Sequence, residues 1–150
     1  MIKIGMIGFG QRGTDLLKQI ILPREDVEIV AVCDLYEDRA ENAKKLVTEK
    51  KNKEPKCFLD YKKVLDIEEI QAVVITSAWE SHIPIAIEAM KAGKTVGMEV
   101  GGAYSIEDCF ELVRVHEQTG VHCMLLENCC YGRYELMVTN MVRQGLFGDI

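Results

Sequence analysis

The sequence is short of proline, aromatic residues and long hydrophobic runs. Only 3 of its 150 residues are proline, and 7% are aromatic. Because 48% of the residues are hydrophobic and 28% are charged, the composition excludes extended disorder and collagen-like structure. No uninterrupted apolar run reaches the length that a membrane-spanning helix needs, so we expect no membrane partner. A chain of this length predicts a single domain.

The features of an exported protein are also missing. Met1 leads directly into the apolar run Ile2–Ile7, without the basic region, long apolar stretch and cleavage site of a secretory signal. We therefore expect a cytoplasmic location, where thiols stay reduced. Most of the six cysteines fall in apolar strand or helix patterns and are expected to pack as small hydrophobes; the six are Cys33, Cys57, Cys109, Cys123, Cys129 and Cys130.

A metal site is the alternative for the densest group of thiols. His122, Cys123, Cys129 and Cys130 are close in the sequence, but no C-x-x-C pair is present. Adjacent cysteines cannot easily both turn toward one tetrahedral ion. We expect no metal here and a packed His122, and zinc analysis of the purified protein tests this expectation.

Acidic residues outnumber basic ones, which gives a formal net charge of -6. Nonspecific nucleic-acid binding needs a positive surface that displaces counterions from phosphates. The lysine-rich stretch Lys50–Glu54 has no aromatic residues for base stacking, and its mixed charge is typical of a solvated helix end or loop. We therefore expect no nucleic-acid partner.

Strand and helix patterns alternate along the chain. Short apolar, β-branched runs predict strands at residues 2–7, 27–33, 57–59, 72–76, 95–99 and 121–126. Apolar residues at helical spacing predict helices at residues 13–21, 37–49, 83–91, 106–118 and 134–144. This alternation predicts an α/β fold with a doubly wound, mainly parallel sheet and helices on both faces. Leu146–Ile150 indicates a turn into another strand, so we expect a second domain beyond residue 150.

A glycine-rich motif follows the first expected strand and opens the first expected helix. Gly8, Gly10 and Gly13 fit the pattern G-x-G-x-x-G. Gly8 suits a tight turn, Gly10 lets the backbone approach a pyrophosphate, and Gly13 allows close packing of helix on strand. The helix N-terminus faces the negative charge. The motif predicts a dinucleotide site, against the alternative of a purely structural turn.

Asp34 ends the second expected strand, at the distance from the motif that dinucleotide sites require. A carboxylate there accepts hydrogen bonds from both ribose hydroxyls and repels a 2′-phosphate. Leu35 and Tyr36 follow it, rather than an arginine that clamps phosphate, although Arg39 could swing back toward the site. The sequence therefore favours NAD over NADP as the cofactor.

Polar residues follow the ends of three further strands. Because open α/β sheets bind ligands at the carboxyl ends of their strands, we expect His82, Glu99 and Asn128 to surround one crevice. Trp79 is expected to pack along the cofactor. The alternatives are that His82 caps a helix beginning at Ile83, that Trp79 covers the sheet, and that Glu99 and Asn128 cap neighbouring loops.

The order of these motifs resembles the N-terminal domain of the Gfo/Idh/MocA family of glucose–fructose oxidoreductases and inositol dehydrogenases. The similarity covers essentially the whole chain, and its main features are Gly8–Gly13, Val32–Asp34, Thr76–His82 and Ala89–Val96. The resemblance implies a Rossmann fold for residues 1–150, an NAD(P) cofactor and a sugar or cyclitol substrate. It also implies a second α/β domain that shapes the substrate pocket, and a homo-oligomer only for the full-length protein.

One position departs from the family pattern. Where the family usually has Glu-Lys-Pro, this sequence has Glu99, Val100 and Gly101. The family lysine commonly lies beside the nicotinamide and assists proton transfer, whereas Val100 has no titratable group. The sequence therefore assigns no catalytic residue, and His82 is the candidate that remains.

A subgroup of the same superfamily offers an explanation. The segments Trp79–His82, Glu99–Val100, Glu127–Tyr131 and Asn140–Gly148 resemble the NAD-dependent α-N-acetylgalactosaminidases. In that branch NAD oxidises a sugar hydroxyl transiently, the neighbouring C–H becomes acidic enough for elimination, and the hydride then returns. The resemblance places at the cofactor Gln11, Arg12, Asp34, Trp79, His82, Glu99, Val100 and Asn128.

Three functions follow as expectations. The main one is the NAD-binding domain of a sugar-active, NAD-dependent oxidoreductase. The alternative is a redox-assisted glycoside hydrolase that recycles its NAD. The third is a non-catalytic nucleotide-sensing module, which the absence of a lysine at Val100 supports. For either enzyme, the 150-residue chain alone is expected to bind NAD weakly and to turn nothing over.

Overall fold

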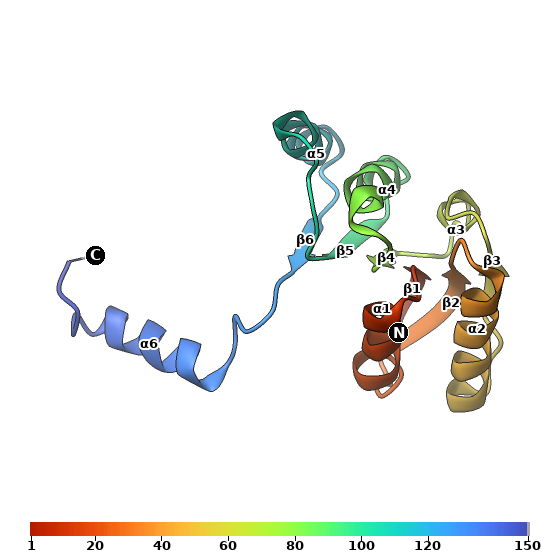
Figure 1. Cartoon of the computed structure of the whole chain (residues 1–150), viewed down its shortest axis with the longest axis horizontal. Coiled ribbons are helices and arrows are strands. Elements are labelled where there is room, and N and C mark those ends of the chain that lie inside the picture. The colour runs from red at the N-terminus through yellow and green to blue at the C-terminus, as the bar shows by residue number, and fades with distance from the viewer. Residues whose placement is uncertain (150) are drawn as a thin grey trace.

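A six-stranded, entirely parallel sheet forms the centre of the computed structural model, which describes residues 1–149 (Figure 1). The strand order is β3-β2-β1-β4-β5-β6. The doubly wound sheet that the sequence predicts is confirmed. The strands are β1 (Ile2–Ile7), β2 (Val27–Cys33), β3 (Lys56–Phe58), β4 (Ala72–Ile75), β5 (Thr95–Glu99) and β6 (Cys123–Leu126).

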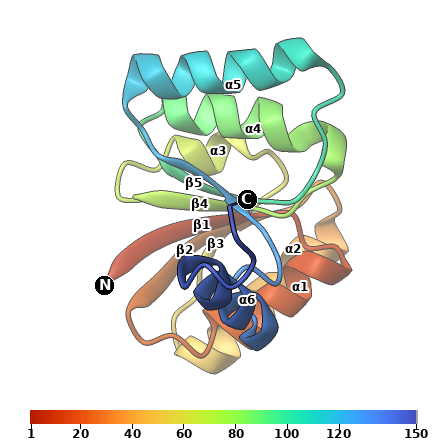
Figure 2. The same ribbon diagram turned by 90° about the vertical axis from the view of Figure 1, so that its left-hand side faces the viewer.

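Helices cover both faces of the sheet (Figure 2). One face carries α1 (Gln11–Leu16), its π-helical continuation η1 (Leu17–Ile21), and α2 (Glu37–Lys51). The other face carries α3 (Lys62–Leu65), α4 (Trp79–Lys91) and α5 (Ile106–Thr119). Each layer is held by its own buried cluster: Met6, Leu17 and Val32 belong to the first, and Ile75 and Met90 to the second.

The direction in which strands are added to the sheet reverses between β1 and β4, the two strands at its middle. Ile4–Ile7 pairs with Ala72–Ile75 on one side and with β2 on the other. Chains that leave adjacent strands toward opposite faces open a crevice at the carboxyl edge, where open α/β sheets bind ligands. The fold therefore brings the ends of β1, β2 and β4 together.

Two helices begin earlier than their sequence patterns predict. The first starts at Gln11 rather than Gly13, and α4 starts at Trp79 rather than Ile83. In α4 the Ser81 hydroxyl donates to the carbonyl oxygen of Ala78 (2.7 Å), which supports the first turn. Pro84 then lies inside the helix, where it costs the backbone one hydrogen bond. The idea that His82 caps this helix is therefore wrong.

The C-terminal part of the chain is less buried than the rest. Beyond Glu99, Val115 in α5 is the one fully buried residue among those that the structure describes. Helix α6 (Arg133–Arg143) has no buried residue and extends away from the sheet (Figure 1). Leu146–Asp149 forms no strand, and Ile150 lies outside the described residues. Among the described helices, all are too short or too polar to cross a membrane.

The expected packing of the cysteines and of His122 is only partly correct. Cys33 is buried, and Cys57 and Cys123 are half-buried. Cys109, Cys129 and Cys130 are exposed, and so is His122, which precedes β6 instead of belonging to it. The physical reason is that α5 buries little of its surface and that residues 127–132 leave the sheet without packing on it.

Candidate functional site

The glycine motif forms the connection between β1 and α1. Gly8 has a φ of 98°, which L side chains rarely adopt, and a methyl group there would overlap the backbone of Ser77. A methyl group on Gly13 would overlap the Gly8 carbonyl oxygen. At Gly10, in contrast, a Cβ would meet no atom within 4 Å. Two glycines are therefore needed for packing, while the third leaves open space beside the backbone.

Thr76 ties this loop to the end of β4. Its hydroxyl donates to the carbonyl oxygen of Gly8 (2.5 Å), and its backbone N–H donates to that of Ile7 (2.8 Å). Thr76 is itself buried. Since the loop is fixed by packing and by hydrogen bonds, the N–H groups at the start of α1 are held in place before any ligand arrives.

Asp34 lies beside the glycine loop, as the sequence predicts. It is buried, with Oδ2 accepting from the backbone N–H of Phe9 (2.6 Å) and Oδ1 from that of Tyr36 (2.9 Å). Each carboxylate oxygen has a further lone pair. The two backbone donors fix the orientation of the carboxylate and leave it able to accept hydrogen bonds from a diol.

A cavity of about 470 Å³ opens at this edge of the sheet. Gly8, Gly10 and Asp34 line it, together with Cys33 at the end of β2. Burial, with the neighbouring Asp34 carboxylate, raises the pKa of the Cys33 thiol to about 12, so this thiol stays neutral. The cavity has the size and shape of a small-molecule site, with mostly apolar walls and few polar groups.

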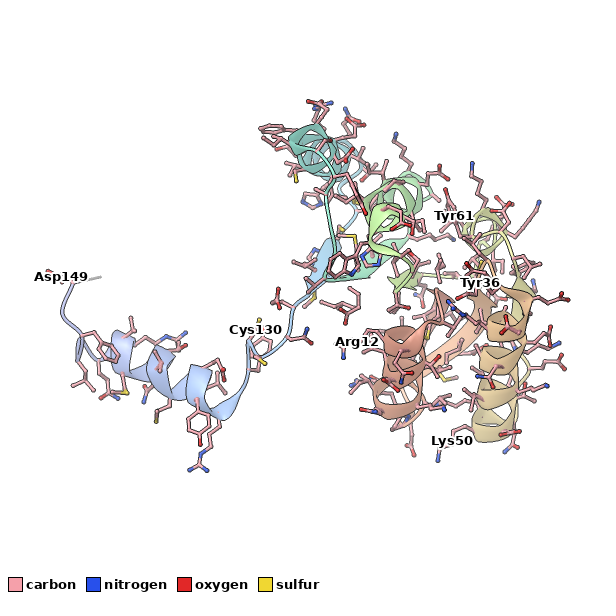
Figure 3. The ribbon with its side chains drawn as sticks, in the orientation of Figure 1. Arg12, Tyr36, Lys50, Tyr61, Cys130 and Asp149 are labelled. Atoms are coloured by element: carbon pink, nitrogen blue, oxygen red, sulfur yellow. The ribbon has the colours of Figure 1, made fainter. Side chains whose placement is uncertain are left out.

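The sequence did not predict the far wall of this cavity. Leu59 and Tyr61 follow the short strand β3 and line the cavity with Tyr36 and Arg39. Figure 3 shows Tyr36 and Tyr61 near one another on this side of the sheet. The Arg39 guanidinium stacks on the Tyr36 ring, 4.5 Å from its centroid. Burial and the neighbouring Glu88 carboxylate raise the pKa of Tyr61 to about 12. The signal was available, because residues after a third parallel strand belong to the same edge.

Glu99, Arg12 and Asn128 form a second polar group at the same edge. The Arg12 guanidinium donates to Glu99 Oε1 from Nε (2.8 Å) and approaches it with Nη2 (2.7 Å). The same Nη2 donates to Asn128 Oδ1 (2.9 Å). Glu99 is buried, and its other oxygen accepts from the backbone N–H of Val100 (3.1 Å). The expectation that Glu99 and Asn128 lie together is met through Arg12, which the sequence did not predict as their link.

His82 lies in the first turn of α4 and is only 1% exposed. Its Nε2 is 2.9 Å from the carbonyl oxygen of Ser77, which can only accept, so Nε2 carries the proton. The buried Nδ1 has no hydrogen-bond partner among the described residues. A Cβ on Gly101 would stand 2.6 Å from Nδ1 and 2.8 Å from Trp79 Cδ1, so the loop after β5 packs on both rings.

Exposed side chains complete this second group. Trp79 is 65% exposed, so the alternative that it covers the sheet is wrong. Val100 is 36% exposed at the end of β5. Gly8, Gly10 and Asp34 thus line the cavity, while Trp79, His82, Glu99, Val100 and Asn128 gather past the ends of β4, β5 and β6. Among residues 1–149 no cluster of side chains suited to a metal ion is found.

Comparison with protein families gives one match. Residues 2–126 fit the model of the Gfo/Idh/MocA family, described as an oxidoreductase family with an NAD-binding Rossmann fold. The α-N-acetylgalactosaminidase of Shewanella oneidensis is 38% identical over 154 aligned positions, which cover 100% of this chain and 33% of that protein. The chain therefore spans about a third of the length of the curated relatives it matches.

Solved structures show the same fold. The scyllo-inositol dehydrogenase of Lactobacillus casei, solved with NAD(H) and scyllo-inositol, has a TM-score of 0.87 at 25% identity, covering 100% of this chain and 43% of that one. The WlbA dehydrogenase of Bordetella pertussis, solved with NADH and UDP-GlcNAcA, has a TM-score of 0.86 at 22% identity, with coverages of 98% and 43%.

Proposed function

The chain belongs to the Gfo/Idh/MocA oxidoreductase family as its NAD-binding Rossmann domain, and we propose that it holds NAD for a sugar-active enzyme of the glycosidase branch. The observation that carries the proposal is the open space at Gly10 next to the fixed carboxylate of Asp34. A rigid glycine-rich loop and an acid that can accept from a diol are the parts that a dinucleotide needs.

The pyrophosphate lies against Gly10 and the start of α1 in this proposal. Backbone N–H groups in the first turn of a helix have no acceptor within the helix, so Gln11, Arg12 and Gly13 have donors to offer. A methyl group at Gly10 would fill the space that the phosphates enter. The glycine motif therefore binds through its backbone, whichever side chains stand at the intervening positions.

The adenosine half occupies the cavity of about 470 Å³. Asp34 accepts from the ribose hydroxyls, and the base lies among the apolar walls near Leu35, Tyr36 and Leu59. A 2′-phosphate would meet the buried Asp34 carboxylate, while Arg39 is stacked on Tyr36. These contacts support NAD rather than NADP as the cofactor.

The nicotinamide end extends toward the ends of β4, β5 and β6, where Trp79, His82, Glu99, Val100 and Asn128 lie. When bound, NAD would accept a hydride reversibly from a sugar carbon. Trp79 and Val100 cover the reacting region with apolar surface, and His82 packs against the loop after β5, with its buried Nδ1 next to Gly101. Val100 has no titratable group, so it cannot take the proton that leaves the sugar hydroxyl.

We propose redox-assisted glycoside cleavage ahead of net oxidoreduction. The support is the 38% identity over the whole chain to an α-N-acetylgalactosaminidase, together with Val100 at the position where family dehydrogenases usually have lysine. Net dehydrogenation of a cyclitol or sugar is the second candidate, and the likeness to scyllo-inositol dehydrogenase favours it.

One assay on the full-length protein separates the candidates. Glycoside release with NAD in catalytic amount and no accumulated NADH supports the hydrolase. Stoichiometric NADH formation supports the dehydrogenase. Tight NAD binding with no turnover of any sugar or glycoside supports a nucleotide-sensing module instead.

The substrate-binding groups belong, in this proposal, to a second domain that follows residue 150. The support is the length of the curated relatives, about three times that of this chain. The exposed apolar residues of α6, among them Leu136 and Met137, suit a surface covered by such a domain. A homo-oligomer is proposed only for that longer protein.

A further inference from the structure

We propose that Arg12 is a positioning residue, which fixes Glu99 and Asn128 at the nicotinamide end of the site, and that its side chain is not a phosphate ligand. The inference rests on the proposed NAD site and assigns a part within it. An arginine inside a phosphate-binding loop would ordinarily be expected to pair with the phosphate, since guanidinium groups bind phosphate in bidentate fashion. The contacts of Arg12 lead to a different assignment.

The guanidinium of Arg12 is turned away from the glycine loop and toward the far strands (Figure 3). It contacts Glu99 Oε1 with two nitrogens, at 2.8 and 2.7 Å, and Asn128 Oδ1 with one, at 2.9 Å. Glu99 is the last residue of β5 and pairs with Leu126 in β6. One side chain from the β1–α1 loop therefore joins the ends of two further strands.

The burial of Glu99 explains why this contact is retained. The Glu99 side chain is 9% exposed, and Arg12 is the cation that faces it within ion-pair distance among the described residues. A buried carboxylate without a countercharge is costly, because it has lost its hydration. If Arg12 turned to a pyrophosphate, Glu99 would keep only the backbone N–H of Val100 as a donor. If the Arg12 side chain bound the phosphate, the buried Glu99 carboxylate would therefore lose its countercharge, which is unfavourable.

In this assignment the backbone and the Arg12 side chain of the loop have different roles. The N–H groups that start α1 are free of helical acceptors and suffice for the phosphates. The Arg12 side chain sets the positions of Val100, through Glu99, and of Asn128. Asn128 also belongs to residues 127–132, the segment that leaves the sheet toward α6. Figure 1 shows this segment between β6 and α6. Arg12 thus connects the phosphate loop to the point where the chain departs from the Rossmann sheet.

Two ligands separate positioning from phosphate binding. ADP-ribose has the pyrophosphate and both riboses of NAD but lacks the nicotinamide. For Arg12→Met we expect NAD affinity to fall by about tenfold and ADP-ribose affinity by less than about threefold, measured by calorimetry. Glu99→Gln is expected to show the same split, and the double variant to lose no more than either single one, because both remove one interaction.

The matched control is Arg24→Met. Arg24 also pairs with a carboxylate, Asp26 Oδ2, at 2.6 Å, but it lies on the opposite edge from the site, after η1. Its loss should change neither affinity. Equal losses of NAD and ADP-ribose affinity in Arg12→Met, with both affinities unchanged in Glu99→Gln, would show a phosphate ligand and overturn the proposal.

A spectroscopic readout remains when no nucleotide binds. The NMR resonance of the Arg12 Nε–H should shift on Glu99→Gln and should stay in place when ADP-ribose shifts the backbone amides of Gly10–Gly13. If the Arg12 Nε–H resonance does not shift on Glu99→Gln, the positioning role is contradicted, whatever effect the ligand has. The wild-type chain could bind neither nucleotide while the Nε–H resonance still shifts on Glu99→Gln. That result would refute the proposed NAD site but support the Arg12–Glu99 contact.

Discussion

The two ends of this chain follow similar hydrophobic patterns but reach very different degrees of burial. Up to Glu99, the sheet and its helices enclose two clusters of fully buried side chains, such as Met6 and Met90. After Glu99, Val115 alone is fully buried among the described residues, and α6 has none. An apolar stripe at helical spacing therefore predicts a helix, but it does not tell whether the stripe has a partner.

This difference bears on where the site lies. The glycine loop, Asp34 and Thr76 belong to the well-buried part, and each is held by backbone contacts from another element. Asn128 lies at the border of the exposed part and is tied back through Arg12. We therefore expect the proposed pyrophosphate and adenosine subsites to be rigid, whereas the proposed nicotinamide end depends on a few side-chain contacts.

Thiol reactivity is expected to show the largest contrast between the two regions. Cys33 is 2% exposed with a pKa raised to about 12, so it needs both opening of the core and deprotonation before it reacts. With an opening free energy of about 5 kcal/mol, alkylation of Cys33 should be at least about a thousandfold slower than that of the exposed Cys129 and Cys130. Mass spectrometry after timed iodoacetamide labelling measures this ratio. Similar rates would show that the core is loose.

Truncating a methionine in each region is expected to give the next largest contrast. Met90 is fully buried, and Met90→Ala should cost about 3 kcal/mol of unfolding free energy, because it removes packing and leaves a cavity. Met137 is 52% exposed on α6, and Met137→Ala should cost less than about 0.5 kcal/mol. Urea denaturation of both variants tests the pair. A large loss for Met137→Ala would mean that α6 has a partner in solution.

Glycine substitutions test the same difference in packing around the backbone. Gly13→Ala would press a methyl group onto the Gly8 carbonyl oxygen and should cost about 2 kcal/mol or more. Gly102→Ala, at a position with nothing within 4 Å of the added Cβ, should change stability by no more than about 0.5 kcal/mol. Thermal unfolding followed by circular dichroism gives both values, and equal melting temperatures would contradict the packing account of Gly13.

Gly10→Ala should affect binding without affecting stability. The added methyl group meets no protein atom, so the free energy of unfolding should stay within about 0.5 kcal/mol of the parent. In the proposed site it stands where the pyrophosphate approaches, so NAD affinity should fall on the order of tenfold. Gly102→Ala serves as the control for the stability measurement. Unchanged NAD affinity would place the phosphates elsewhere.

The sequence predicts the buried part well, because its signals are local. The run Ala72–Ile75 is apolar on both faces, as a central parallel strand requires, and Gly93 follows α4 in the left-handed conformation that glycine commonly adopts at a helix C-terminus. In the less buried part, the start of α5 is also set by a local signal, because the Ser105 side chain accepts from the N–H of Asp108. Asp34 beside Gly8 and Gly10 also follows from strand order.

The parts that the sequence did not predict depend on contacts between distant residues. Arg12 and Glu99 are 87 positions apart, and no local pattern indicates that they meet. The exposure of Cys129 and Cys130 reflects the lack of packing around residues 127–132, which periodicity does not report. The early start of α4 depends on hydroxyl contacts of Ser81, which offset the helix-breaking signal of Pro84.

The central claim is that a dinucleotide lies across the glycine loop with its adenosine ribose on Asp34. Calorimetric titration of the folded chain with NAD and NADP, in parallel with Asp34→Ala, tests this most directly. We predict binding of NAD at millimolar concentration, weaker binding of NADP, and loss of the NAD signal in Asp34→Ala, because that variant removes the acceptor for the ribose diol. A folded parent chain that binds neither nucleotide at that concentration, or an Asp34→Ala variant that binds NAD as the parent does, would contradict the claim.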